Sequence, residues 1–157
     1  MKYTVRYAHL ESMSHLKVGD SLKFGDFIGI MGTSGQSKFN HLHIDLIYGF
    51  VRKIIRLREI GILKRYKPCK TQLDYFKDED LFKFKLVITT QYMCKEYKKI
   101  YGKNHPAYDL VPKDRHRSKD HFKIYFNRKK VKNVEILFVG FDQIGYGFCV
   151  LIGYETL

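Results

Sequence analysis

Short runs in which apolar and aromatic residues alternate with polar ones recur along most of the chain, separated by glycines. Alternation places successive side chains on opposite faces of a strand, and β-branched and aromatic residues favour that conformation. The pattern therefore predicts a mainly β protein with few short helices. The expected strands cover residues 3–10, 27–32, 41–47, 82–89, 110–111, 134–141 and 147–154.

Other segments carry weaker patterns. Residues 16–20 and 22–26 are near-copies of one phrase, an apolar residue followed by Gly-Asp, and each predicts a short extended piece closed by a turn. Residues 50–67 fit a short helix or a basic strand, and the lysine-rich residues 92–101 fit a turn or a short helix. The basic run at 127–133 lies between two strand-like runs and predicts a solvated hairpin turn.

The size of the chain, 157 residues with 45% hydrophobic residues, predicts one domain with a sizeable core. No apolar run reaches the length of a membrane span, and the first residues lack the apolar stretch of a secretory signal. Three cysteines, Cys69, Cys94 and Cys149, show no metal-type spacing and are interpreted as buried or half-buried thiols.

The formal net charge is +13, with lysines and arginines spread along the chain. A balance of this size attracts polyanions, of which an anionic cell-wall polymer and nucleic acid are two candidates. Charge alone does not choose between them.

Candidate chemistry enters with the histidines. In the expected strand 41–47, His41, His43 and Asp45 share one face, while the intervening apolar residues share the other. His9 stands near the end of the expected strand 3–10. Zinc in a hydrolase takes three protein ligands, commonly His nitrogen and Asp oxygen, and leaves a fourth position for water.

One such ligand set is His43, His105 and Asp109. His41, one alternation from His43, would then lie close to the metal without binding it, where it could accept a proton from water or polarise the oxyanion. His9 could be its partner across a neighbouring strand. The remaining histidines, His15, His116 and His121, have no such neighbours and are interpreted as surface or hydrogen-bonding residues.

The motifs YAHL at residues 7–10 and HLH at residues 41–43, with the glycine-rich stretch between them, closely resemble the second half of the lysostaphin/LytM-type zinc endopeptidases. Residues 84–92 and 105–110 look like the start of that domain, with its His-x-Gly-x-Asp motif. Residues 144–152 resemble the strand that ordinarily precedes the Tyr-x-His-Leu strand, and residues 67–76 are similar to the closing phrase. The resemblance implies an antiparallel β-sheet domain of the duplicated-hybrid-motif type.

The order of the two halves departs from the family, because the His-x-x-x-Asp half comes last. Residues 82–157 followed by 1–76 restore the familiar order, with residues 77–81 as the joint. We therefore predict a circularly permuted single domain whose chain ends, Met1 and Leu157, lie on neighbouring antiparallel strands. A rival interpretation is a metal site shared between two chains.

Carried over by position, the resemblance implies His105, Asp109 and His43 as zinc ligands, with His41 as the general base and His9 steadying the tetrahedral oxyanion. Two departures are small: Ala107 replaces the usual Gly, and Asp45 stands where Glu is common. Neither removes a ligand.

The expected function is therefore zinc-dependent cleavage of peptide bonds in bacterial peptidoglycan, in a cross-bridge or a stem peptide. Loops 33–40 and 111–121 should select the bond. The protein would act extracellularly at the cell wall, as a phage lysin or tail-tip component carried on the virion or released by lysis. The alternatives are a non-catalytic, metal-stabilised structural or wall-binding module of a phage particle, and a nucleic-acid-binding β protein.

Overall fold

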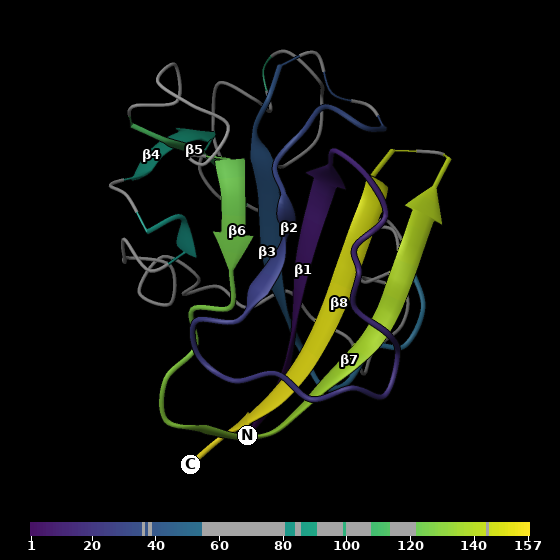
Figure 1. The fold of residues 1–157 in the computed structure, drawn as a ribbon, viewed down its shortest axis with the longest axis vertical. Helices are drawn as coiled ribbons and strands as arrows, with labels where there is room; N and C mark the ends of the chain where they lie inside the picture. The colour runs from purple at the N-terminus through teal and green to yellow at the C-terminus, as the bar shows by residue number, and fades with distance from the viewer. Residues whose placement is uncertain are drawn as a thin grey trace.

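The computed structural model describes residues 1–35, 37, 39–54, 81–83, 86–90, 99, 108–113, 122–143 and 145–157. Eight strands lie in this part of the chain, and they form two antiparallel sheets (Figure 1). The strands are β1 (Lys2–Leu10), β2 (Phe27–Ile30), β3 (Leu42–Tyr48), β4 (Leu86–Thr90), β5 (Tyr108–Pro112), β6 (Lys123–Tyr125), β7 (Val131–Asp142) and β8 (Gly147–Thr156). The mainly β, antiparallel prediction is confirmed.

The larger sheet has the strand order β4-β5-β3-β1-β8-β7, and the smaller sheet pairs β2 with β6. The smaller sheet lies in front of the larger one in Figure 1. Within the described residues, no helix is long and apolar enough to cross a membrane. Most of the segments expected at 50–67 and 92–101 lie outside the described residues, as do 67–76 and the joint at 77–80.

The main core fills the space between the two sheets. Ile28 from β2 and Ile124 from β6 are fully buried, and they join one cluster with Val5, Leu42 and Ile152 of the larger sheet. Burying a side chain of this size contributes roughly 1.5–3 kcal/mol. The small sheet is therefore held on the large one mainly by apolar packing.

The alternation expected in β3 is confirmed. Leu42, Ile44 and Leu46 all belong to the core between the sheets. Because side chains alternate across a strand, His43 and Asp45 project from the opposite face. That face carries its own smaller apolar clusters, which include Ile47 and Leu151, so the candidate site residues lie on a packed surface.

The two Gly-Asp phrases form matching turns, as expected. The amide of Asp20 donates to the carbonyl of Lys17, and the amide of Asp26 donates to that of Lys23, each at 3.0 Å. The glycine before each aspartate has a positive φ, a conformation that glycine adopts without a steric penalty. The turns shape the connection between β1 and β2.

The two ends of the chain meet on adjacent strands. β1 pairs antiparallel with β8 in a register that places Tyr3 opposite Tyr154 and Thr4 opposite Gly153. The N-terminal ammonium donates to the hydroxyl of Thr156 at 3.2 Å, and both termini lie together at the lower end of Figure 1. The expected position of the chain ends is confirmed, while the circular permutation itself stays a prediction.

The basic run at 127–133 is not the solvated hairpin turn that we expected. It begins as a link between the two sheets, because β6 pairs with β2 whereas β7 pairs with β8. Asn127 and Arg128 are buried in this link, and residues from Val131 onward already belong to β7. The prediction failed because the polar or charged character of these residues does not reveal whether the segment that contains them is buried between packed sheets.

Candidate metal centre

The candidate centre begins at the pairing of β3 with β5. The register places His43 directly opposite Asp109, and Nδ1 of His43 lies 3.3 Å from Oδ1 of Asp109. The sequence placed Asp109 in a loop entering a strand at Leu110, but β5 already begins at Tyr108. The sheet ladder therefore holds the carboxylate against the imidazole.

This separation suits two ligands of one zinc ion. Zinc binds His nitrogen and Asp oxygen at about 2.0–2.2 Å in tetrahedral sites, so two of its donor atoms lie about 3.3 Å apart. The chemistry of both side chains also fits this ion. His43 and Asp109 could therefore hold zinc together.

His105, the third expected ligand, lies outside the described residues, as does Ala107. Among the residues that the structure describes, no set of three or more His, Cys, Asp or Glu side chains could hold a metal by itself. Two of the three expected ligands lie side by side, and zinc binding, like the completion of the site by His105, stays a prediction.

His41 borders this pair just before β3. An isolated bridge pairs it with Gly32, and its Nε2 lies 3.6 Å from Oδ1 of Asp109. Its Nδ1 lies 2.8 Å from the carbonyl oxygen of Phe39. A carbonyl only accepts hydrogen bonds, so Nδ1 carries the proton. In the neutral ring, Nε2 then has a lone pair on the side of Asp109.

His9 reaches the same place from β1 through an irregularity in the strand. The pairing of β1 with β8 shifts register between Tyr7 and Leu10, and His9 has a φ of 61°. Bulges of this kind turn a side chain away from its regular direction. The ring centroid of His9 consequently lies 4.9 Å from that of His41 and 5.6 Å from that of His43.

The His9 ring is held by the loop that follows β2. Its Nδ1 donates to the carbonyl of Ser34 at 2.7 Å. Burial, followed by the nearby His43, lowers the pKa of His9 to about 4. The structure thus brings together four of the five residues predicted for the site: His9, His41, His43 and Asp109.

A buried ion pair, which no sequence pattern predicted, lies behind His43. Arg6 on β1 is fully buried and donates to both carboxylate oxygens of Asp45, from Nε at 2.9 Å and from Nη2 at 2.7 Å. Oδ1 of Asp45 lies 3.7 Å from Nε2 of His43. The guanidinium also lies over the ring of Tyr146, at 4.0 Å from its centroid.

The ion pair favours the charged form of Arg6 inside the protein. Burial opposes the charge on Arg6, but Asp45 more than offsets this effect and raises the pKa of Arg6 above its ordinary value. Asp45, which the alternation placed on one strand face with His43, therefore positions its carboxylate beside the imidazole.

Ser34 and Gly35 fasten the loop that supports His9. The hydroxyl of Ser34 donates to the carbonyl of Leu10 and accepts from the amide of Phe148 at 2.9 Å. Gly35 has a φ of 77°, and a Cβ at this position would lie 2.4 Å from the carbonyl oxygen of Gly145. Only glycine fits this contact.

Gly35→Ala should therefore destabilise the loop and lower activity, because an added methyl group collides with backbone atoms. The control is Gly19→Ala: Gly19 also has a positive φ, 93°, but a Cβ there meets nothing within 4 Å. Both variants incur conformational strain of about 1–3 kcal/mol, so thermal unfolding should show a larger loss for Gly35→Ala. Equal losses would contradict the collision.

Residues outside the centre behave largely as expected. His15 is exposed and stacks on Phe27, while His116 and His121 lie outside the described residues. Cys149 is a free thiol that is buried, which confirms its interpretation as a buried or half-buried thiol, and burial raises its pKa to about 12. Cys69 and Cys94 lie outside the described residues.

Comparison with known families points to peptidases. Residues 1–52 match the model of peptidase family M23, a segment that contains His9, His41 and His43. The match supports a lysostaphin/LytM-type family for this chain. Neither the curated proteins nor the solved structures gave a match.

Proposed function

We propose that this protein is a zinc-dependent endopeptidase that cleaves peptide bonds in bacterial peptidoglycan, in a cross-bridge or a stem peptide. The observation that supports the proposal most strongly is the convergence of His9, His41, His43 and Asp109. These residues come from three strands and one adjoining loop, and their proximity follows from the sheet pairing rather than from their spacing in the sequence.

The proposed ligands are His43, Asp109 and His105. Bound zinc would polarise the scissile carbonyl and lower the pKa of a water molecule to about 7. Asp45 would orient the ring of His43 from behind through Nε2, as carboxylates beside metal-binding histidines commonly do.

His41 is the proposed general base. Its Nδ1 proton is engaged by the carbonyl of Phe39, so Nε2 is the nitrogen that takes the proton from the attacking water and later returns it to the departing amine. The position of Nε2 beside Asp109 puts it within reach of a molecule held at the metal ligands.

His9 is the second proposed catalytic residue. Its Nδ1 proton is engaged by Ser34, so the neutral ring offers only an acceptor at Nε2. Steadying the oxyanion, the role implied by the family resemblance, would require a proton on that nitrogen. We therefore propose that His9 accepts a hydrogen bond from the attacking water at Nε2 and orients this water beside His41.

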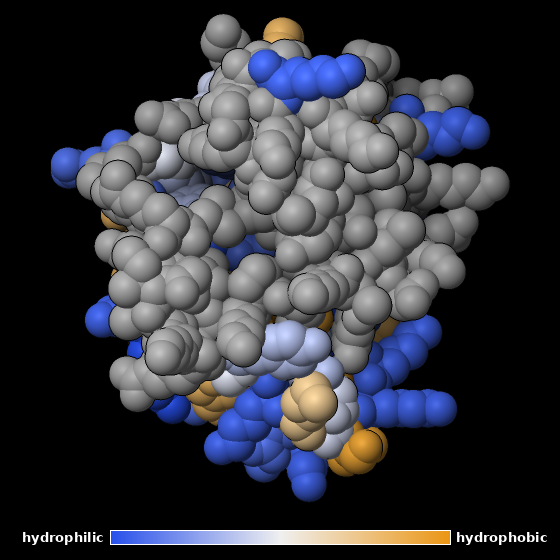
Figure 2. Space-filling model, turned by 180° about the vertical axis from the view of Figure 1, so that it is seen from behind, coloured by the Kyte–Doolittle hydropathy of each residue, from blue (hydrophilic) through white to orange (hydrophobic). Residues whose placement is uncertain are grey.

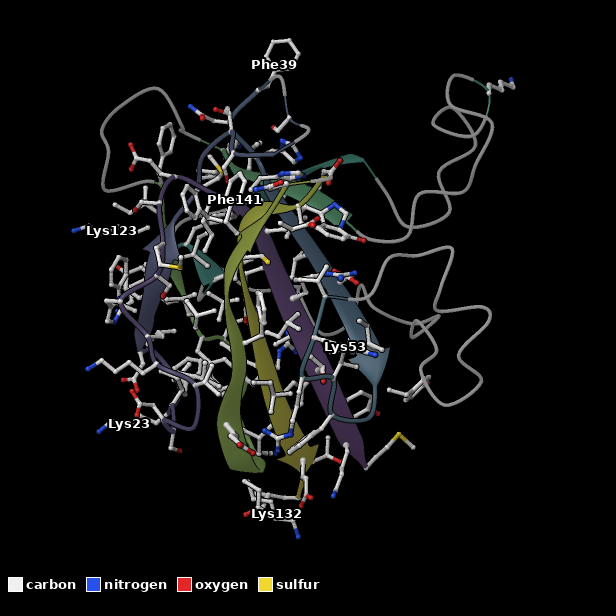
Figure 3. All side chains as sticks on the ribbon, turned by 90° about the vertical axis from the view of Figure 1, so that its right-hand side faces the viewer. Lys23, Phe39, Lys53, Lys123, Lys132 and Phe141 are labelled. Carbon is white, nitrogen blue, oxygen red and sulfur yellow. The ribbon has the colours of Figure 1, made fainter. Side chains whose placement is uncertain are left out.

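The surface near the centre includes an exposed aromatic residue. Phe39 lies in the loop before β3 and is 78% exposed, and it projects from the upper end of the molecule in Figure 3. Its carbonyl supports His41 while its ring faces outward. We propose that this loop contacts the substrate peptide and contributes to the choice of bond.

Digestion of purified peptidoglycan tests the proposal. The zinc-loaded protein should release fragments that carry new amino and carboxyl termini, which mass spectrometry identifies together with the cleaved bond. Removal of zinc by a chelator should stop release, and added zinc should restore it.

Intact walls after incubation with protein of verified zinc content would overturn the enzymatic proposal. If that protein still sedimented with the walls, it would act instead as the wall-binding module named as the alternative. We also propose that the protein acts extracellularly at the wall, either carried on a phage particle or released by lysis. This location is inferred from peptidoglycan as the proposed substrate.

A further inference from the structure

The outer face of the small β2–β6 sheet combines aromatic and basic side chains. Ile28, Ile124 and Phe126 point inward and are fully buried. Because side chains alternate, Phe27 and Tyr125 point outward, and they face each other in the register of the two strands. This surface is separate from the candidate metal centre.

Each of these two half-buried rings has an imidazole or an ammonium group against it. The ring of His15 stacks on Phe27 at 5.4 Å. The ammonium of Lys83 lies 4.5 Å from the ring centroid of Tyr125. The distance between Lys83 and Tyr125 lies within the range of attractive cation–π contacts.

A second contact of the same kind lies beside the first. The ammonium of Lys129 lies 4.6 Å from the ring centroid of Phe24, and this segment is joined to the small sheet because the amide of Gly25 donates to the carbonyl of Phe126. Lys23 and Lys123 project on the same side of the molecule (Figure 3). The cations are thus distributed over the face and partly held in place by rings.

We propose that this surface, comprising His15, Lys23, Phe24, Phe27, Lys83, Lys123, Tyr125 and Lys129, binds the phosphates of a linear phosphodiester polymer that lacks aromatic bases. Fixed ammonium groups lose less conformational entropy on binding than free lysines do. With a chain net charge of +13, the surface complements a string of negative charges.

The covered rings favour such a polymer over nucleic acid. Proteins that bind single-stranded nucleic acids leave aromatic faces open, because successive bases stack on them. Here Phe24 and Tyr125 each have a face beneath an ammonium, and Phe27 has one beside His15. The rings orient charge instead of providing stacking platforms.

The two sites lie on opposite sides of the large sheet. The small sheet packs on the face that contains Val5, Ile44 and Ile152, whereas His43 and Asp45 project from the other face. A polymer on the small sheet would therefore leave the metal centre accessible. The inference does not depend on the proposed peptidase activity.

Binding to poly(glycerol phosphate), measured by calorimetry over a series of NaCl concentrations, tests the surface. The double variant Lys83→Gln, Lys129→Gln should bind at least tenfold more weakly. By analogy with single-stranded polyanions, the slope of log Kobs against log salt should fall by about 1.4 for two lost contacts.

The matched control is Lys53→Gln, Lys132→Gln, which removes the same charge elsewhere. Lys53 lies on the opposite side of the molecule and Lys132 at its lower end (Figure 3), and Figure 2 shows that hydrophilic side chains also surround that end. This control should bind within about twofold of the unchanged protein. Equal weakening by both double variants would overturn the proposal, since it would show attraction to total charge.

Two further measurements separate the role of the rings. Phe24→Leu keeps every charge, so the salt slope should stay unchanged. Binding should still weaken severalfold, because Lys129 loses the ring that holds its ammonium in place. An oligothymidylate with the same number of phosphates should bind more weakly than poly(glycerol phosphate). Tighter binding of the oligothymidylate, lost in Phe24→Leu, would mean that bases stack on the rings and would overturn the proposal in favour of nucleic acid.

Discussion

His43→Ala is expected to lose zinc and peptidoglycan cleavage together, whereas His41→Ala should keep zinc and lose turnover. His43 lies beside Asp109 on paired strands, so its removal takes away a proposed ligand. His41 is the proposed base, and positioned acid–base groups contribute typically 10²–10⁴-fold to rate. Zinc content by metal analysis and the initial rate of fragment release measure the two effects separately.

Lys53→Ala is the control for these variants, because Lys53 is exposed and belongs to neither the candidate metal centre nor the proposed phosphate-binding surface. It should retain both zinc and activity. Normal digestion of walls by His41→Ala would show that the base is assigned wrongly. Loss of zinc in that variant would instead make His41 a ligand.

Much of the fold could be predicted because period-two alternation is a local property of the chain. In β3 the pattern identified both the core face, with Leu42, Ile44 and Leu46, and the functional face. The adjacency of His43 and Asp109 is a different matter, since 66 positions separate them in the sequence. It was expected only through the resemblance to a known family.

Other features of the site depend on the assembled sheet and left no local signal. Arg6 occupies a strand position that could equally face solvent, and its burial becomes understandable only with Asp45 on the neighbouring strand. His9 turns toward His41 because of a bulge opposite β8. Single-sequence alternation predicts neither feature.

The placement of the chain ends bears on the two explanations for the inverted motif order. β8 and β1 pair as the arms of a hairpin would, and the gap between their ends is bridged by contacts of Met1 with Thr156. Termini that lie close together are what a circular permutation requires. His43 and Asp109 also meet within one chain, so this pair needs no second subunit.

Arg6→Met should lower the free energy of unfolding by about 3–5 kcal/mol, because it leaves Asp45 as a buried charge without its main counter-ion. For a chain of this size, the loss corresponds to a fall in Tm of roughly 6–20 °C, measurable by calorimetry. Arg52→Met is the control: Arg52 also donates two hydrogen bonds to one carboxylate, from Nη1 and Nη2 to Glu135 at 2.9 and 3.1 Å, but on the exposed surface. Its loss should change Tm little.

Removing both buried charges separates stability from positioning. Arg6→Met combined with Asp45→Leu should recover much of the lost stability, since apolar pairs of similar volume often replace buried ion pairs without cost. Zinc affinity should stay reduced, by about 10–100-fold, because His43 no longer has a carboxylate behind it. If the double variant regained both stability and zinc affinity, Asp45 would serve only to neutralise Arg6, and the orientation of His43 would depend on the sheet alone.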